Sequence, residues 1–573
     1  MGRDGGSADP RIAGSRDRRI GGSWDRAVPW CAAVLVCLVG FAAPARAQYP
    51  DARLVPRGVL RLGFEPQYLS YGERFDAAGL RQPLGTDFSD SAAGVRLFPT
   101  LLTPQAAVAS IIGDTAYRMD LGVFRTMLDA DIRRFPLTVQ FGLTSRIALT
   151  AALPIVTTRS QVDFVVDSAA ANVGWNQAAA QAGNATAVQQ IQALLGQIGA
   201  AAAAVEAGIA AGDYGCPTGP TCDEARSAAA DARQVQLGLT ALSGVDETGA
   251  LAAVISPYAP TAGSAAGTAI LAAVQSIGAR LAALGAPAVS ETFPLPTGTA
   301  GAGAVNTMLP DSGFGYWASP LAMTKYKQKL GDIEVGLRLG VVQSRAARTV
   351  LWATVRLPTG MVDSPDNYLD IGTGDHQMDV EFGFEGAWEP GSFLGIAASA
   401  SYNLQLGDQL VRRVASHVDP IAPLSTRTLV SRNLGDELRA AVYPSLRLSR
   451  IFTAYGSASY YRKSIDQYTL AGSGDGTGLD PALLAFETAM STWSFGGGLH
   501  YYAAEGRSGP ALPIEAGIDF RSAFQGKGGQ APKSTSVSFY LRIPIRIFGG
   551  APAPPTEAPE APPSAAEPPP PGR

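Results

Sequence analysis

Residues 331–360 decide the fold: they read GDIEVGLRLGVVQ, then SRAAR, then TVLWATVRLPTG. In the first arm one face holds Ile333, Val335, Leu337, Leu339 and Val341, and the other holds Asp332, Glu334, Gly336, Arg338 and Gly340. The second arm places Leu351, Ala353, Val355 and Leu357 opposite Trp352, Thr354, Arg356 and Pro358. Because strand side chains change face at every residue, each arm is predicted to be a strand with one apolar and one polar face.

A soluble β-sandwich would show the same two-residue period, so the period alone does not say what the apolar face contacts. Three further features favour a membrane barrel: the charges on the polar face, the repetition of the unit and an export signal. A barrel with an apolar exterior and a polar lumen accommodates all three.

The same alternation recurs along the chain and predicts about twelve strands. The other ten segments are residues 58–65, 134–143, 147–155, 377–388, 393–406, 437–448, 452–462, 493–502, 514–524 and 537–547. Short turns, such as 144–146 and 449–450, alternate with long polar loops, such as 407–436 and 463–492. Short periplasmic turns and long outer loops are typical of bacterial barrels. The predicted fold class is therefore an all-β antiparallel transmembrane β-barrel with an α-helical insertion.

Residues 1–47 are predicted to be a signal peptide. A basic segment precedes the apolar run WCAAVLVCLVGFAA at 30–43, and Ala45 and Ala47 form a small-x-small cleavage site before Gln48. The alternative, an N-terminal membrane anchor, needs about 20 apolar residues. We found no other window of spanning length free of charge and proline. The chain is thus expected in the outer membrane of a Gram-negative-type cell.

The chain departs from a plain barrel in the Ala-rich insertion 162–303, which divides the barrel into 48–161 and 304–548. Apolar residues recur at steps of three and four, which predicts three helices with coiled-coil-like seams. The seam residues of the three predicted helices are, in order, Val188, Ile191, Leu195, Ile198, Ala202, Val205 and Ile209; Ala228, Ala232, Val235, Leu239 and Leu242; and Ile270, Val274, Ile277, Leu281 and Leu284. Since turn 144–146 should be periplasmic, the insertion should be extracellular. It is interpreted either as a lid over the pore or as a low-complexity insertion without a role.

Two cysteines remain after the signal peptide, Cys216 and Cys222. In an oxidising compartment such a close pair predicts a disulfide. A metal site is the rival interpretation, but two thiolates without nearby histidine are too few ligands. The sequence predicts neither a metal nor a cofactor.

The inward positions carry nine acids and nine arginines, which are the candidate pore lining. The acids are Glu65, Asp332, Glu334, Asp379, Glu381, Glu385, Glu437, Glu515 and Asp519; the arginines are Arg61, Arg134, Arg338, Arg356, Arg439, Arg447, Arg521, Arg542 and Arg546. A pore selective for one ion sign would be biased one way. The balance suggests ion pairs that narrow the lumen, or pairs that only stabilise the wall.

Several stretches resemble a known family. They are FGLTSR at 141–146, ALPI at 152–155, GDIEVGLR at 331–338, RLPTG at 356–360, and GTG at 372–374 before Gln377, Asp379 and Glu381. This pattern resembles the outer-membrane transporter-like proteins associated with a meta-pathway of phenol degradation, over most of 57–548 except the insertion. The resemblance implies passage of small hydrophobic or aromatic compounds across the outer membrane, and it transfers no solute-binding residue.

Catalysis has little support in the sequence. The three histidines are His376, His417 and His500. His500 is predicted to face the lumen, where a Ser-His-Asp hydrolase is conceivable, but no nucleophile motif accompanies it. No enzyme activity is therefore predicted.

Both the composition and the tail limit the choice of partners. The net charge of −4 argues against nucleic acid. The Pro-rich segment 549–573 has no core-forming residues and is expected in the periplasm, either spanning toward the cell wall or as an inert extension. Expected partners are outer-membrane lipid, the barrel-assembly machinery and small apolar or aromatic solutes.

Three hypotheses follow. The first is a channel for passive uptake or efflux of such solutes. The second is a surface protein that uses the barrel as an anchor while the helical insertion binds a partner. The third is a barrel enzyme.

Overall fold

The structure is a computed structural model that describes residues 49–50, 52–179, 184–321, 324–391, 393–416, 419–472, 478–503 and 513–548. The predicted signal peptide at 1–47 and the predicted Pro-rich tail at 549–573 lie outside the described residues.

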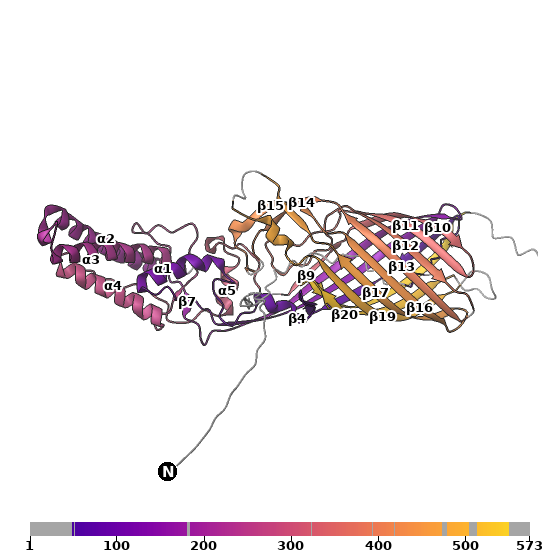
Figure 1. Ribbon diagram of the computed structural model, residues 1–573, viewed down its shortest axis with the longest axis horizontal. Helices are drawn as coiled ribbons and strands as arrows, with labels where there is room; N and C mark the ends of the chain where they lie inside the picture. The colour runs from indigo at the N-terminus through magenta and orange to yellow at the C-terminus, as the bar shows by residue number, and fades with distance from the viewer. Residues whose placement is uncertain are drawn as a thin grey trace, which may run out of the picture. The chain divides into compact units, whose positions relative to one another are not determined.

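Twelve antiparallel strands close into a barrel within the described part of the chain (Figure 1). In sheet order they are β1 (Val59–Phe64) with β2 (Gln67–Tyr71) as one interrupted strand, β5 (Val123–Gly142), β6 (Ile147–Asp167), β10 (Ile333–Gln343), β11 (Ala347–Leu357), β12 (Asp379–Trp388), β13 (Leu394–Gln405), β16 (Glu437–Arg447), β17 (Phe452–Lys463), β19 (Met490–Tyr502), β20 (Glu515–Lys527) and β22 (Thr535–Arg546). Strand β22 pairs with β20 on one side and with β1 and β2 on the other, which closes the ring. The predicted fold class is confirmed.

The exterior of the barrel is apolar. On β10, Val335, Leu337 and Leu339 are 49%, 44% and 41% exposed, whereas Glu334 and Arg338 between them are less exposed. Large exposed side chains continue around the ring, including Phe382 of β12, Phe495 of β19 and Phe520 of β20. Closure leaves no unpaired strand edge in the ring, and lipid is the solvent that suits such a surface.

Strands β5 and β6 form a hairpin that continues well beyond the apolar exterior. Their pairing runs without interruption from Gly142↔Ala148 to Val123↔Asp167. Along β5 the outward face changes from Leu137 to Arg133 and Asp129, so the distal half leaves the hydrocarbon layer. Strand β9 (Lys325–Leu330) pairs with this distal part of β6.

The predicted start of the insertion at residue 162 therefore falls inside a strand. Val162 pairs with Leu128, and the ladder continues to Asp167. The strands continue past residue 162 because one face of this hairpin is buried. On that face Phe124, Leu128 and Phe164 belong to the hydrophobic core shared with the helices.

Three helices follow, α2 (Ala185–Ala211), α3 (Pro220–Ser243) and α4 (Ala265–Ala283), as the three- and four-residue spacing indicates. Ile191, Leu195 and Ile198 of α2 are fully enclosed, or nearly so, against the other helices. On the surface, Arg233 of α3 hydrogen-bonds Glu206 of α2 and thereby lowers the pKa of that carboxyl. Both α2 and α4 are long and apolar enough to span a membrane by length and composition, so the statement that no other such window exists was wrong.

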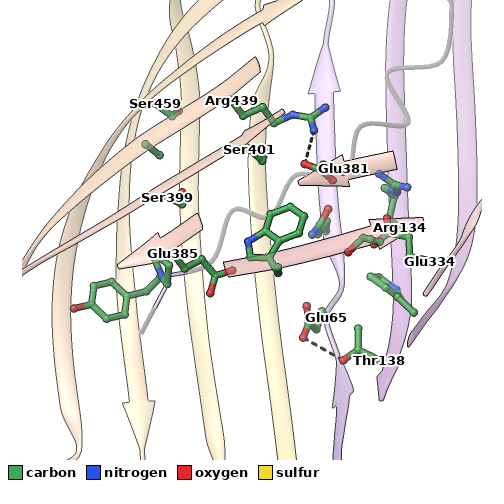
Figure 2. A pocket seen from close by; sticks show the side chains of 18 of the residues that line it. Glu65, Arg134, Thr138, Glu334, Glu381, Glu385, Ser399, Ser401, Arg439 and Ser459 are labelled. Atoms are coloured by element: carbon green, nitrogen blue, oxygen red, sulfur yellow. Dashed lines mark hydrogen bonds and ion pairs between the residues drawn. The ribbon is translucent and has the colours of Figure 1, made fainter. Parts of the chain in front are cut away.

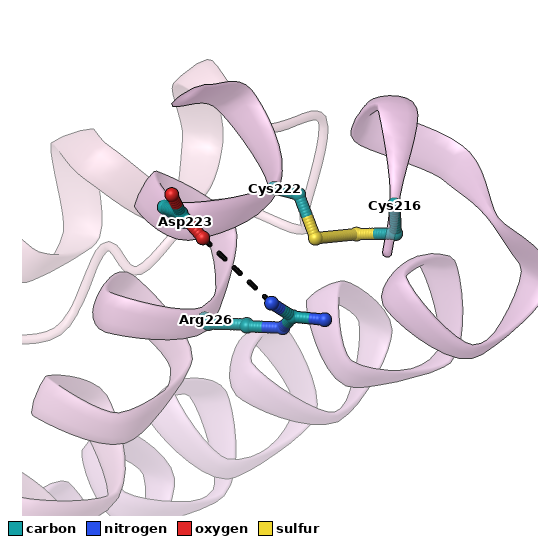
Figure 3. Close-up of a disulfide and its surroundings, with 4 residues drawn as sticks. All are labelled: Cys216, Cys222, Asp223 and Arg226. Carbon is teal, nitrogen blue, oxygen red and sulfur yellow. Dashed lines mark ion pairs between the residues drawn. A yellow bond between two sulfur atoms is a disulfide. The ribbon is translucent and has the colours of Figure 1, made fainter. Parts of the chain in front are cut away.

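Cys216 and Cys222 form the disulfide, with an S–S distance of 2.05 Å (Figure 3). It closes the connection between the end of α2 and the start of α3, where Asp223 and Arg226 form an ion pair at 3.7 Å.

One helix of this region comes from a part of the chain predicted to be barrel only. Helix α1 (Leu102–Ile112) lies in the first outer loop and buries Pro104, Ala107, Val108 and Ile111, and its Ile111 packs against Gly238 of α3. The three- and four-residue spacing of these residues was the available sequence signal. Another short helix is α5 (Ala302–Met308).

A single hydrophobic core joins the helices to one end of the barrel. It includes Ile132 of β5, Val156 of β6 and Leu369 and Ile421 of two long loops at that end. Small sheets complete this region: β14 (Asp408–Arg413), β15 (Arg427–Asn433) and β18 (Gln467–Leu470); β3 (Glu73–Phe75), β4 (Arg81–Pro83) and β21 (Ala531–Pro532); and β7 (Val173–Trp175) with β8 (Tyr258–Pro260). The insertion thus packs on one end of the barrel through this shared core.

Candidate functional site: the barrel lumen

The barrel encloses a cavity of about 340 Å³. Each of the twelve described strands contributes to its lining, from Arg61 on β1 to Arg542 on β22. The cavity is therefore the lumen itself. Ten of the predicted lumen-facing residues line it: Arg61, Glu65, Arg134, Glu334, Arg338, Glu381, Glu385, Arg439, Arg521 and Arg542.

One ion-pair cluster forms where the first and last strands meet. Arg542 donates to Glu65 at 2.8 Å and to Glu515 at 2.7 Å. Arg61 donates to the other oxygen of Glu515 at 3.0 Å. Glu515 is buried, and it joins β20 to β1 across β22. This cluster connects the two ends of the barrel sequence.

A second cluster lies on β10 to β16. Arg356 donates to Asp379, directly opposite on β12, at 2.5 Å. Glu334 and Glu381 are 3.8 and 3.7 Å from the same guanidinium. Arg439 reaches Glu381 at 3.3 Å (Figure 2). Because Arg356 and Asp379 are buried and absent from the cavity lining, this pair stabilises the wall.

All these pairs run along the wall. Arg338 of β10 donates to Glu385 of β12 at 3.2 Å, which again spans two neighbouring positions in the sheet. Within the described ring, the ion pairs between the predicted acids and arginines join residues of the same strand or of strands no more than two apart in the sheet. The arrangement favours the interpretation in which the pairs stabilise the wall.

Four other predicted lumen residues lie elsewhere. Asp332 is buried at the outer end of β10, where its carboxylate accepts hydrogen bonds from the Gly360 and Asp375 amides. Asp519 is buried and accepts a hydrogen bond from the Tyr455 hydroxyl at 3.1 Å. Arg447 forms an ion pair with Glu389. Arg546 is exposed at the end of β22.

The strands from β13 to β22 also add hydroxyl groups to the lining. Ser399 and Ser401 of β13, Ser459 of β17, Thr492 and Ser494 of β19 and Ser536 of β22 line the cavity. Figure 2 shows Ser399, Ser401 and Ser459 on the same side of the view as Glu385 and Arg439, with Arg134 and Glu334 on the other side. The lumen lining therefore mixes hydroxyl groups with charged side chains.

The segment before β1 enters the lumen. No pattern in the sequence predicted this position. Tyr49, Pro50 and Arg53 line the cavity. The Tyr49 ring lies 5.1 Å from that of Tyr455, and the Arg53 guanidinium lies 3.9 Å over the ring of Tyr502. The only sequence feature that could have indicated this position is an aromatic residue and an arginine shortly before the first strand. Such residues are equally common in a segment that simply leads into a strand.

His500 offers no catalytic arrangement. Its Nδ1 lies 2.5 Å from the Tyr540 hydroxyl, and its ring packs 5.6 Å from that of Tyr49. His376 is in an outer loop, and His417 lies outside the described residues. Among the described residues no three His, Cys, Asp or Glu side chains are grouped so as to hold a metal ion.

No family model matches the sequence, and no curated protein matches it. Among solved structures, the chain is similar to an outer-membrane channel of Pseudomonas putida F1, with a TM-score of 0.37 and 7% identity over 87% of this chain and 99% of that one. A FadL homologue of Pseudomonas aeruginosa is similar with a TM-score of 0.26 and 10% identity, over 90% and 100% of the two chains. The toluene transporter TbuX of Ralstonia pickettii is similar with a TM-score of 0.26 and 7% identity, over 86% and 90%.

Proposed function

We propose that the protein is a passive outer-membrane channel for small aromatic compounds. The observation that carries the proposal is the cavity of about 340 Å³, lined by charged, hydroxyl and aromatic side chains, inside a barrel with an apolar exterior. Export by the signal peptide 1–47, a periplasmic tail and an extracellular insertion belong to the same proposal.

The size of the cavity supports a solute of one ring. A cavity of about 150 Å³ holds benzene, so the lumen has room for a substituted ring with a few waters. The N-terminal segment around Tyr49 and the inward arginines keep the passage narrow. The resemblance to the family associated with phenol degradation supports aromatic compounds as the solute class.

Solute flux into liposomes tests the proposal. Purified full-length protein should admit phenol-sized polar solutes, such as benzyl alcohol, and exclude an oligosaccharide too large for the lumen. Protein-free liposomes and liposomes with heat-unfolded protein are the controls. Flux equal to these controls for every solute in the panel would reject the channel.

A second function rests on the helical insertion. Leu237 of α3 is 72% exposed and Leu102 of α1 is 59% exposed, although both helices belong to a folded bundle. Exposed leucines of this kind favour the alternative of a barrel-anchored surface protein whose insertion binds a partner. If the liposome assay shows no solute flux through the barrel, the partner-binding function is the one that remains.

A further inference from the structure

Arg521 of β20 differs from most of the arginines around it. Arg61, Arg338, Arg439 and Arg542 each form an ion pair with a glutamate. Arg521 forms none with any described carboxylate, and its Nε and Nη2 have no hydrogen-bond partner among the described residues. Yet it lines the cavity and remains partly exposed to it. A guanidinium with two unpaired N–H groups at a cavity wall can donate hydrogen bonds to an anion in that cavity.

The nearby acid, Asp519, attracts Arg521 but does not occupy its Nε and Nη2 donors. Asp519 lies two residues earlier on the same face of β20, but its carboxylate is buried and accepts the hydrogen bond from Tyr455. No ion pair joins Asp519 to Arg521 within the described residues. The Nε and Nη2 groups of Arg521 are therefore available to a solute in the cavity.

The surroundings of Arg521 suit a carboxylate. It is paired in register with Gly496 of β19, which has no side chain, and with Ser536 of β22. Ser494 and Ser536 line the same cavity, and the Tyr443 hydroxyl neighbours the guanidinium. An arginine with adjacent hydroxyl donors is a common arrangement for binding a planar carboxylate.

The lining as a whole favours one negative charge. Among the described lining residues there are seven arginines and four glutamates, because several acids, such as Glu515 and Asp379, are recessed in the wall. The recessed Glu515 offsets part of this positive excess at Arg61 and Arg542, so the remaining excess favours a solute with a single negative charge. The four lining glutamates oppose a second negative charge on the solute.

Aromatic side chains complete the site. Trp352, Tyr443 and Tyr461 line the cavity and offer ring faces or edges to an apolar body. A solute with an aromatic ring and a carboxylate at one end would contact the aromatic side chains with its ring and Arg521 with its carboxylate.

We propose that Arg521 is the anion-binding residue of the lumen and makes it selective for small aromatic monocarboxylates. This inference rests on the proposed channel function and specifies its substrate class.

Reversal potentials in planar bilayers across a sodium benzoate gradient test it, with purified full-length protein. The wild-type channel should pass benzoate in preference to Na⁺. Arg521→Gln should lower the benzoate-to-Na⁺ permeability ratio about tenfold, as expected for loss of a charged hydrogen bond. Arg521→Lys keeps the positive charge but cannot donate two parallel hydrogen bonds. Its permeability ratio should lie between those of the wild type and Arg521→Gln. Phthalate, with two carboxylates, should permeate less well than benzoate.

Arg125→Gln is the matched control, because Arg125 is exposed on the outward face of β5 and absent from the cavity lining. It should leave the ratio unchanged, and benzyl alcohol flux should be the same in all variants. A folded Arg521→Gln channel with the wild-type ratio would overturn the inference, as would a wild-type channel that prefers Na⁺. Neither result touches the channel proposal, which fails only if the wild type carries neither benzoate nor benzyl alcohol.

Discussion

Tyr49 and Ser445 are 396 residues apart in the chain, yet their hydroxyl oxygens lie 3.1 Å apart inside the barrel. Tyr49 also packs against Tyr443, Tyr455 and His500. The first described residues are thus bound to β16, β17 and β19, and they reduce the open cross-section of the lumen.

We expect Tyr49→Ala to raise single-channel conductance. The substitution removes three ring contacts worth about 0.5–1.5 kcal/mol each, so the segment should leave its position part of the time. Conductance in planar bilayers measures the effect. Tyr326→Ala, at an exposed position on β9, is the control and should behave as wild type. Identical conductance of Tyr49→Ala and wild type would show that the segment does not restrict the pore.

An outward charge should impair assembly where an inward one does not. Leu337→Arg places a guanidinium in the hydrocarbon layer, at a cost of about 2–4 kcal/mol near the midplane. The neighbouring glycine is a poor inward control, because a Cβ on Gly336 would lie 2.6 Å from the Ala353 oxygen. Thr150→Arg is better, since Thr150 lines the cavity and pairs with Gly336. Heat-modifiable gel mobility should show less folded Leu337→Arg than Thr150→Arg, and equal folding of the two would mean that the facing is misassigned.

Removal of the helical insertion should raise solute flux if the bundle is a lid. The Ala300 amide donates to the Val173 oxygen at 3.1 Å, so a short Gly/Ser linker can replace the residues between them. All twelve described barrel strands remain, and the barrel should still show heat-modifiable mobility. Benzyl alcohol uptake into liposomes measures the change. A correctly folded deletion with unchanged flux would remove the lid and favour partner binding.

Loss of the disulfide should loosen the bundle without affecting the barrel. Cys216 and Cys222 are six residues apart, and closing so short a loop stabilises by about 2 kcal/mol. Cys222→Ser should therefore increase proteolytic cleavage near the link between α2 and α3, while heat-modifiable mobility stays as in wild type. A reductant should reproduce this in the wild type and add nothing to a Cys216→Ser/Cys222→Ser double variant. Thiol labelling of the wild type without a reductant would contradict the prediction.

Local features of this protein were predictable from the sequence. Leu337 and Arg338 take opposite faces because a strand alternates at every residue, whatever it pairs with. The helices α2, α3 and α4 follow from the three- and four-residue spacing of their own apolar side chains. For the same reason the number of strands and the placement of short turns could be derived without knowing any contact.

Only the tertiary structure decided which charges remain exposed to the lumen. Nine acids and nine arginines point inward by alternation, but strand register places Glu515 between Arg61 and Arg542, and Asp379 behind Arg356. The entry of Tyr49 into the lumen likewise depends on a ring that closes between β1 and β22, about the full length of the chain apart. Strand alternation is local to one segment, whereas the depth of a carboxylate and the partner of an arginine depend on register between distant segments. Arg521 is therefore distinguished from the other arginines by barrel closure and not by its own sequence context.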